Sequence, residues 1–208
     1  MGDSEDLKPR KEPAQERSRE MVERLLEATA RLLIAEGYRH MSTNRIAKEA
    51  GVSVGSLYQY FPNKDAMVLA LFERVCERQT AVVVEKLSEM AESEGATLEL
   101  AVRAVVHALL EATQVDAELS RVLLLEVTHL EGFHLLRAWL ERIRALVAVA
   151  MQSKADTLRP RDLDVASFIV VNAVNGILYS AEIENRELLT DHRFADELIE
   201  LIIRYLRP

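Results

Sequence analysis

Residues 43–62, TNRIAKEAGVSVGSLYQYFP, restrict the possible folds of this chain more than any other stretch. Two short helices fit here, one ending at Gly51 and the other before Pro62, because glycine accepts a positive φ and proline disfavours a preceding helical residue. The small Ala47 lets two helices cross closely, and Leu57 can anchor the second helix to a core. The pattern predicts a helix-turn-helix.

The rest of the chain is also expected to be helical. Only seven Gly and five Pro occur among 208 residues, and strand-like alternation is scarce. Ser42 or Thr43 is expected to cap the second helix, Ser53 the third and Asn63 the fourth. The fold class is therefore all-α, with about nine helices. They are expected at about 16–36, 43–50, 53–61, 63–91, 97–114, 117–129, 133–155, 162–185 and 191–207.

Composition divides the chain into three parts. Residues 1–14 are polar and contain two prolines, so we expect a disordered basic arm before a helix-turn-helix domain at 15–62 and a helical body at 63–208. The net charge is −8, but residues 8–64 carry eleven Lys and Arg against seven Asp and Glu. A basic N-terminal quarter on an acidic body is what a DNA-binding head on a body that does not bind DNA needs.

The sequence favours a cytoplasmic protein. The single cysteine, Cys76, excludes an intramolecular disulfide and fits a reducing compartment. The first residues have no apolar core, so no signal peptide is expected. The most apolar run, 165–181, contains Asn172 and Asn175, which lipid disfavours, so we expect a buried helix and no membrane partner.

Two tyrosines in the second helix of the motif are candidates for contact with nucleic acid. If Leu57 and Phe61 face the core, Tyr58 and Tyr60 lie on the flanks of that face. A flanking tyrosine can pack its ring against protein while its hydroxyl reaches a phosphate or a base edge. The alternative is that both rings only hold the small domain together.

Other polar groups near the motif extend this hypothesis. Lys64 places a cation at the start of the next helix, and Thr43 could bind a second phosphate. Lys8, Arg10 and Lys11 on the arm could enter the minor groove, although such a tail is more often only solvated charge.

Three motifs in residues 19–75 resemble the N-terminal domain of TetR-type (tetracycline-repressor-like) transcriptional regulators. They are Ala-Glu-Gly-Tyr at 35–38, Ile-Ala-x-x-Ala-Gly-Val-Ser at 46–53 and Leu-Tyr-x-Tyr-Phe-x-x-Lys at 57–64. The resemblance covers about the first third of the chain, and the nine-helix count also matches the family. It implies a homodimeric repressor that binds a palindromic operator and releases it when a small molecule binds the body.

The resemblance also implies roles for individual residues. Phosphate contacts would fall on Thr43, Tyr58, Tyr60 and Lys64, and base-reading positions on Asn44, Ser53, Val54 and Ser56. Asn44 stands where members of the family often have an arginine. It could instead pair with adenine, and the adjacent Arg45 is a further candidate. Because Val54 and Gly55 offer few hydrogen bonds, DNA shape is expected to contribute to recognition.

The body is expected to hold the dimer interface and the effector site. The helix at 162–185 is apolar almost all round, so it needs burial on two sides. The resemblance implies a four-helix bundle formed by the last two helices of each subunit, and the alternative is a central core helix in a monomer. Polar residues on apolar stripes are candidates for binding a hydrophobic effector, although core or interface hydrogen bonds explain them equally well. These residues are Glu126, Trp139, Asn172 and Asn175.

The sequence also offers features of two other classes of protein. The spacings Glu126-x-x-His129 and Glu131-x-x-His134 fit a metal-ligand motif, but a dinuclear site needs the motif on two separate helices. These copies are almost adjacent, so we expect no metal, no cofactor and no enzyme. An architectural DNA-binding protein without an effector is the other alternative, and it would need a more basic head.

Overall fold

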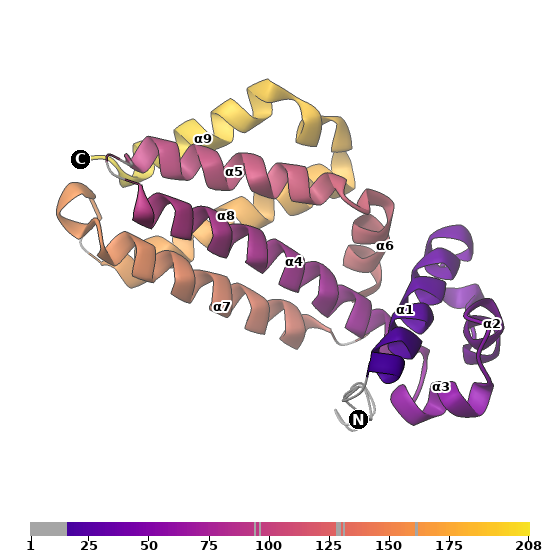
Figure 1. Ribbon diagram of the computed structural model, residues 1–208. Helices are drawn as coiled ribbons and strands as arrows, with labels where there is room; N and C mark the ends of the chain where they lie inside the picture. The colour runs from indigo at the N-terminus through magenta and orange to yellow at the C-terminus, as the bar shows by residue number, and fades with distance from the viewer. Residues whose placement is uncertain (1–15, 94, 96, 128–129, 131, 161) are drawn as a thin grey trace. The chain divides into compact units, whose positions relative to one another are not determined.

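The computed structural model of the protein describes residues 16–208, except 94, 96, 128, 129, 131 and 161 (Figure 1). The described residues form α-helices and short 3₁₀ helices without any strand, which confirms the predicted all-α class. The α-helices are α1 (Glu16–Glu36), α2 (Thr43–Glu49), α3 (Val54–Tyr60), α4 (Lys64–Glu92), α5 (Leu98–Gln114), α6 (Ala117–Val127), α7 (Phe133–Gln152), α8 (Leu163–Glu184) and α9 (His192–Leu206). The 3₁₀ helices are η2 (Tyr38–His40), η3 (Ala155–Thr157) and η4 (Arg186–Thr190).

Side-chain caps set the starts of the helices in and after the motif. The Ser42 hydroxyl accepts the backbone N–H of Arg45 at 3.4 Å, and the Ser53 hydroxyl accepts that of Ser56 at 3.0 Å. The Asn63 Oδ1 atom accepts a third N–H at the start of α4, at 2.8 Å. Ser42, and not Thr43, therefore caps α2, which leaves the Thr43 hydroxyl available for another partner.

The predicted end of the seventh helix is wrong by three residues. We expected this helix to continue to residue 155, but α7 ends at Gln152 and η3 follows. The Ser153 hydroxyl donates to the carbonyl oxygen of Ala150 at 2.8 Å. A serine that bonds its own backbone in this way competes with the helical hydrogen bonds, which explains the earlier end.

The chain separates into two compact units. The first contains the chain up to Val75 together with 116–134, and the second contains 76–115 and 135–208. This grouping places α6 and the start of α4 with the helix-turn-helix. The predicted functional division into a head at 15–62 and a body at 63–208 stays a prediction, and the predicted arm at 1–14 lies outside the described residues.

The first unit has a core built around the motif. α1 packs against α2 and α6, and α2 packs against α3. The side chains of Leu25, Ile46, Leu57 and Phe61 are at most 1% exposed. Because Leu57 and Phe61 are both buried, the predicted inward face of α3 is confirmed.

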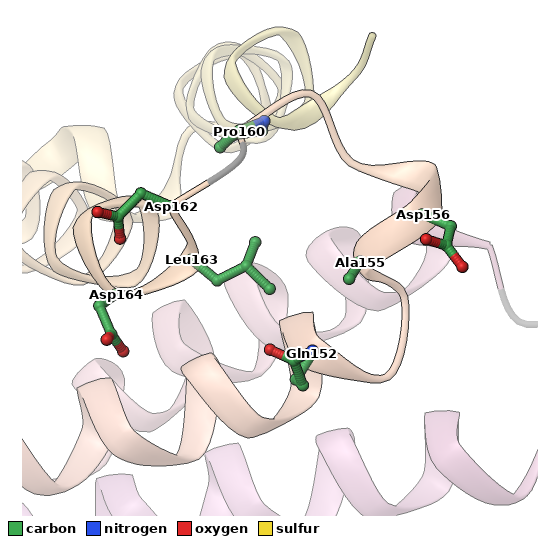
Figure 2. A pocket seen from close by; sticks show the side chains of 7 residues that line it. All are labelled: Gln152, Ala155, Asp156, Pro160, Asp162, Leu163 and Asp164. Atoms are coloured by element: carbon green, nitrogen blue, oxygen red, sulfur yellow. The ribbon is translucent and has the colours of Figure 1, made fainter.

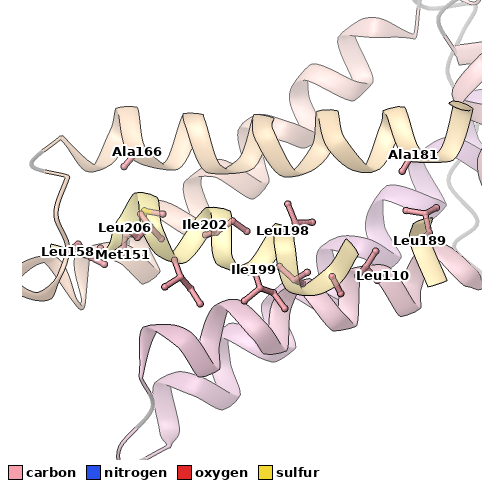
Figure 3. Packing of buried hydrophobic residues seen from close by; sticks show 13 residues of the cluster. Leu110, Met151, Leu158, Ala166, Ala181, Leu189, Leu198, Ile199, Ile202 and Leu206 are labelled. Carbon is pink, nitrogen blue, oxygen red and sulfur yellow. The ribbon is translucent and has the colours of Figure 1, made fainter. Parts of the chain in front are cut away.

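The second unit has two apolar clusters. The larger one joins α5, α8 and α9 and includes Leu110, Ala166, Ile199 and Leu206 (Figure 3). The smaller one has three buried members among the described residues, one each from α4, α7 and α8, and the half-buried Trp139 packs against it. The smaller cluster therefore has few buried members and is bordered mostly by partly buried side chains.

α8 is buried on one side and exposed on the other. Ala166, Val171 and Ala181 are buried, whereas Val165 and Phe168 on another face are about half exposed. The helix is long and apolar enough to cross a membrane when judged by length and composition alone, a test that core helices of soluble proteins also pass. In a single chain, α8 therefore leaves an apolar stripe uncovered.

Candidate nucleic-acid interface

The turn between α2 and α3 has the backbone conformation that the sequence predicts. Gly51 has a φ of 64°, in the left-handed region that glycine accepts without strain. The backbone N–H of Val52 then donates to the carbonyl oxygen of Ala47 at 2.9 Å, which closes the turn. α3 begins at Val54, capped by Ser53, so its direction is set by these few residues.

The two tyrosines of α3 occupy different environments. Tyr60 is only 7% exposed, so most of its ring lies in the core, whereas Tyr58 is 40% exposed. The Tyr58 hydroxyl lies 3.0 Å from the Thr43 hydroxyl of α2. The structure thus brings two of the predicted phosphate contacts together, one from each helix of the motif.

The predicted base-reading residues lie at the starts of α2 and α3. Asn44 and Ser53 are exposed, and Val54 and Ser56 are half-buried. The hydroxyls of Ser53 and Ser56 lie 2.8 Å apart, so they bond to each other. One hydroxyl proton is used in this bond and the other is not. A DNA base would either replace the bond or accept a hydrogen bond from the second hydroxyl.

Arg45 is held by the protein's own acceptors. Its guanidinium forms an ion pair with Glu36 at the end of α1 and donates to the carbonyl oxygen of His40 at 3.3 Å. The Arg45 side chain is about half exposed, so a DNA phosphate or base could reach it. Arg45 would then either leave Glu36 or bind Glu36 and DNA at the same time.

Lys64 also bonds within the first unit. Its ammonium donates to the carbonyl oxygens of Tyr38 and Met41 at 2.9 and 3.2 Å and lies 3.9 Å from the centre of the Tyr38 ring. The Tyr38 hydroxyl in turn donates to Asp65. Burial raises the pKa of the Tyr38 phenol above its ordinary value, and the hydrogen bond to Asp65 and the charge of Glu126 act in the same direction. Lys64 is thus anchored at the junction of η2 and α4.

Arg24 of α1 is a residue that the sequence analysis did not single out. Its guanidinium donates to the carbonyl oxygens of Ala50 and Gly51, which end α2 and form the turn. No sequence signal marks such a bond, because its acceptors are backbone atoms 26 and 27 positions along the chain.

The four predicted effector residues are divided between the two compact units. Glu126 belongs to the first compact unit, whereas Trp139, Asn172 and Asn175 belong to the second. Asn172 is exposed, and its amide donates to the carbonyl oxygen of Phe168 at 2.8 Å. Asn175 is half-buried one turn further along the helix.

Trp139 of α7 has its polar atom bonded to α4. The indole N–H donates to the carbonyl oxygen of Cys76 at 3.1 Å and to the Thr80 hydroxyl at 3.0 Å. The Thr80 hydroxyl itself donates to the carbonyl oxygen of Cys76 at 2.8 Å. Only the apolar surface of Trp139 therefore remains for a ligand.

An open cavity of about 590 Å³ lies between the end of α7 and the start of α8 (Figure 2). Its lining includes the carboxylates of Asp156, Asp162 and Asp164, and none of the predicted effector residues. Its acidic lining does not suit a hydrophobic effector. Among the described residues, no group of three or more His, Cys, Asp or Glu could hold a metal, and His129 and Glu131 of the rejected metal motif lie outside them.

Comparison with protein families gives two matches. Residues 25–71 match the profile of bacterial regulatory proteins of the tetR family. Residues 97–206, more than half of the chain, match the tetracycline-repressor-like C-terminal domain. The two matches include the whole of α2, α3 and α5 to α9.

Known proteins resemble the chain over different extents. The nucleoid occlusion factor SlmA of Glaesserella parasuis is 33% identical over 117 residues, which are 56% of this chain and 54% of that protein. The chain therefore spans about half the length of the curated relatives it matches.

Solved structures resemble the chain in fold over most of its length. A complex of SmeT with triclosan is 20% identical with a TM-score of 0.70, and covers 90% of this chain and 92% of its own. The fatty acid degradation regulator FadR of Bacillus halodurans is 22% identical with a TM-score of 0.66, and covers 87% and 93%. Together with the helix-turn-helix and the two matched domains, these likenesses lead to one conclusion: the chain belongs to the TetR family of bacterial regulatory proteins.

Proposed function

We propose that the protein is a cytoplasmic homodimeric repressor, without enzymatic activity, that binds a palindromic DNA operator through α2 and α3. The observation that carries the proposal is the pair of hydroxyls from Thr43 and Tyr58, 3.0 Å apart at the surface of the motif. Two hydroxyls at this distance can donate to the oxygens of one phosphate, which would fix the position of α3 on the duplex.

Base reading is proposed for the residues at the starts of the two helices. Asn44 and Ser53 are exposed there, and Ser56 and Val54 lie beside them. The side chains are short, so recognition by groove shape is expected to add to direct contacts. Arg45, Tyr60 and Lys64 complete the proposed contact set, with Lys64 acting from the start of α4.

The exposed stripe of α8 supports a dimer through α8 and α9. Val165, Phe168 and Ile169 are between 41% and 52% exposed in the single chain. A second copy would remove this apolar surface from water. Two linked heads could then occupy successive major grooves about 34–36 Å apart, which is what a palindromic operator requires.

A hydrophobic effector is proposed to bind near Trp139 in the second unit. The small cluster of Val83, Ile143 and Val171 adjoins its ring and is bordered by other partly buried apolar side chains. The SmeT structure contains triclosan, an apolar compound, in a protein of the same fold. α4 continues from Lys64 into this unit, so a ligand that displaces α4 would act on the head through one continuous helix.

The DNA proposal is tested by selecting binding sites from random duplexes. The selected duplex is then titrated against a scrambled one at about 50 mM and about 200 mM salt. A selected palindrome that is bound more tightly than the scrambled duplex at both concentrations would support the proposal. Affinity that follows only the salt concentration would refute it.

Tyr58→Phe is expected to weaken operator binding at least roughly tenfold, because a hydrogen bond to a charged group contributes about 1.5 kcal/mol or more. Thermal stability should hardly change, since the Tyr58 hydroxyl is exposed. Thr43→Val tests whether the two hydroxyls act together: the double variant should lose less affinity than the sum of the single losses. Thr157→Val in η3 is the control, because it removes an exposed hydroxyl outside the motif, and equal losses in that variant would contradict the assignment.

Binding of an apolar effector is expected to change the emission of Trp139, the only tryptophan of the chain. Triclosan is a first probe, titrated into the protein–operator complex while emission and operator release are recorded together. Release without any change in emission would place the effector site away from Trp139. The same titration with Trp139→Phe would show whether the indole also contributes to affinity.

A DNA-binding protein without an effector is the second candidate. It is supported by the relatives that are named nucleoid occlusion factors and that match about half of this chain. This candidate predicts that no small molecule changes DNA binding, and that many sites are bound with similar affinity. The site selection and a screen of apolar compounds against the operator complex distinguish the two.

A further inference from the structure

We infer that Arg24 is a positioning residue for DNA recognition: by binding the carbonyl oxygens of Ala50 and Gly51, it fixes the turn that orients α3. The inference rests on the proposed function, since it concerns how the same motif reads DNA. Arg24 lies on α1, and none of the proposed DNA-binding residues belongs to that helix.

The contacts form a fork around the end of α2. The Nη2 atom of Arg24 lies 2.7 Å from the carbonyl oxygen of Ala50 and 3.0 Å from that of Gly51. The Nε atom lies 3.2 Å from the same Ala50 oxygen. Three charge-assisted bonds therefore connect one side chain of α1 to two consecutive carbonyls, with the planar geometry that a guanidinium offers.

These carbonyls lie where the helix leaves them without helical partners. The next backbone N–H groups bond other carbonyl oxygens: that of Gly51 donates to Lys48, and that of Val52 donates to Ala47. The end of a helix also carries a partial negative charge, which attracts a cation. Arg24 supplies both the donors and the charge at this point.

The position of the fork gives it a role in recognition. Gly51 lies three residues before Val54, the first residue of α3, and it has no side chain to restrict its backbone. Without Arg24, this short connection would keep only the backbone bonds of the turn and the Ser53 cap at the start of α3. α3 would then sample more orientations, and the specific contacts of Thr43 and Tyr58 with DNA would form less often.

The test compares Arg24→Gln and Arg24→Lys with the control Arg31→Gln. Arg31 lies seven residues further along α1 and bonds the Glu49 side chain at 3.0 Å, so the control removes the same charge without touching the turn. Arg24→Gln is expected to weaken binding of the selected operator at least about tenfold. Its affinity for the scrambled duplex is expected to stay within about twofold, so the ratio of the two affinities falls.

Arg24→Lys keeps the charge but cannot bridge both carbonyls with a planar fork. We expect the ratio of operator affinity to scrambled-duplex affinity in Arg24→Lys to lie between those of Arg24→Gln and the wild type. Arg31→Gln should have the wild-type ratio. If Arg24→Gln does not fold, Arg24→Lys alone decides the question, because a full recovery by lysine would overturn the inference.

Two other results would also overturn it. An equal loss on both duplexes, with the salt slope reduced by about one, would make Arg24 a phosphate contact. A lower thermal midpoint with an unchanged affinity ratio would make its role only structural.

A second readout separates this inference from the proposed function. Amide hydrogen exchange of Val52 and Leu57 in the DNA-free protein should be faster in Arg24→Gln than in the wild type and in Arg31→Gln. If the wild type itself fails to distinguish the two duplexes, the proposed function fails, while the exchange rates still test the fork. Unchanged exchange in Arg24→Gln would overturn the inference whatever the DNA result.

Discussion

Phe168→Asp is expected to convert the dimer to a monomer and to weaken operator binding by about 10²–10⁴-fold, the range over which two linked sites exceed one. Phe168 lies on α8 and is 52% exposed in the single chain, beside the exposed Val165 and Ile169. An aspartate there would have to lose its hydration in a dimer interface without a partner of opposite charge, and this strongly opposes association.

The monomer itself should stay folded, because the Phe168 side chain is outside the core clusters of the second unit. Mass by light scattering checks the association state, and far-UV circular dichroism checks the helices. Leu100→Asp is a matched control: Leu100 is also about half exposed, but it lies at the start of α5. A dimer that persists in Phe168→Asp, or one that is lost equally in Leu100→Asp, would contradict an interface on α8.

Leu57→Ala is expected to lower the free energy of unfolding by about 2–5 kcal/mol and to remove operator binding. Leu57 is fully buried in the core that joins α3 to α1 and α2. The substitution leaves a cavity under the helix that carries Tyr58, so stability and the placement of that tyrosine should decline together.

Urea unfolding followed by circular dichroism measures the stability change of Leu57→Ala, and the operator titration measures its functional effect. Gln59→Ala in the same helix is the control, because Gln59 is exposed and should change stability by less than about 0.5 kcal/mol. A Leu57→Ala protein with nearly unchanged stability and full operator affinity would show that α3 is not held by this core.

The local features of the motif could be predicted from the sequence because each depends on neighbouring residues. The Ser53 cap, the positive φ of Gly51 and the inward face of Leu57 and Phe61 all follow from spacing within two turns. The same spacing places both Tyr58 and Tyr60 on the flanks of this face, so it does not distinguish their burial. Only the packing of α3 in the first unit distinguishes the buried ring from the exposed one.

The long-range bonds of the cations could not be predicted. Arg24, Arg45 and Lys64 bond carbonyl or carboxylate oxygens that the fold alone brings near, and a carbonyl leaves no mark in a sequence. Helical periodicity places a polar side chain such as Glu126 or Trp139 on one face of a helix but does not say which unit that face belongs to. Glu126 and Trp139 therefore fell into different units.

The separate roles of Ser42 and Thr43 have a consequence for how such a regulator can be changed. The cap of α2 is made by Ser42 alone, while the adjacent Thr43 directs its hydroxyl to Tyr58. If Thr43 binds DNA as proposed, substitutions at position 43 would change the affinity for the operator while the Ser42 cap keeps the start of α2 intact. Two adjacent hydroxyl residues therefore have separate roles: Ser42 must be kept for the stability of α2, whereas Thr43 can be varied to change the proposed DNA contact.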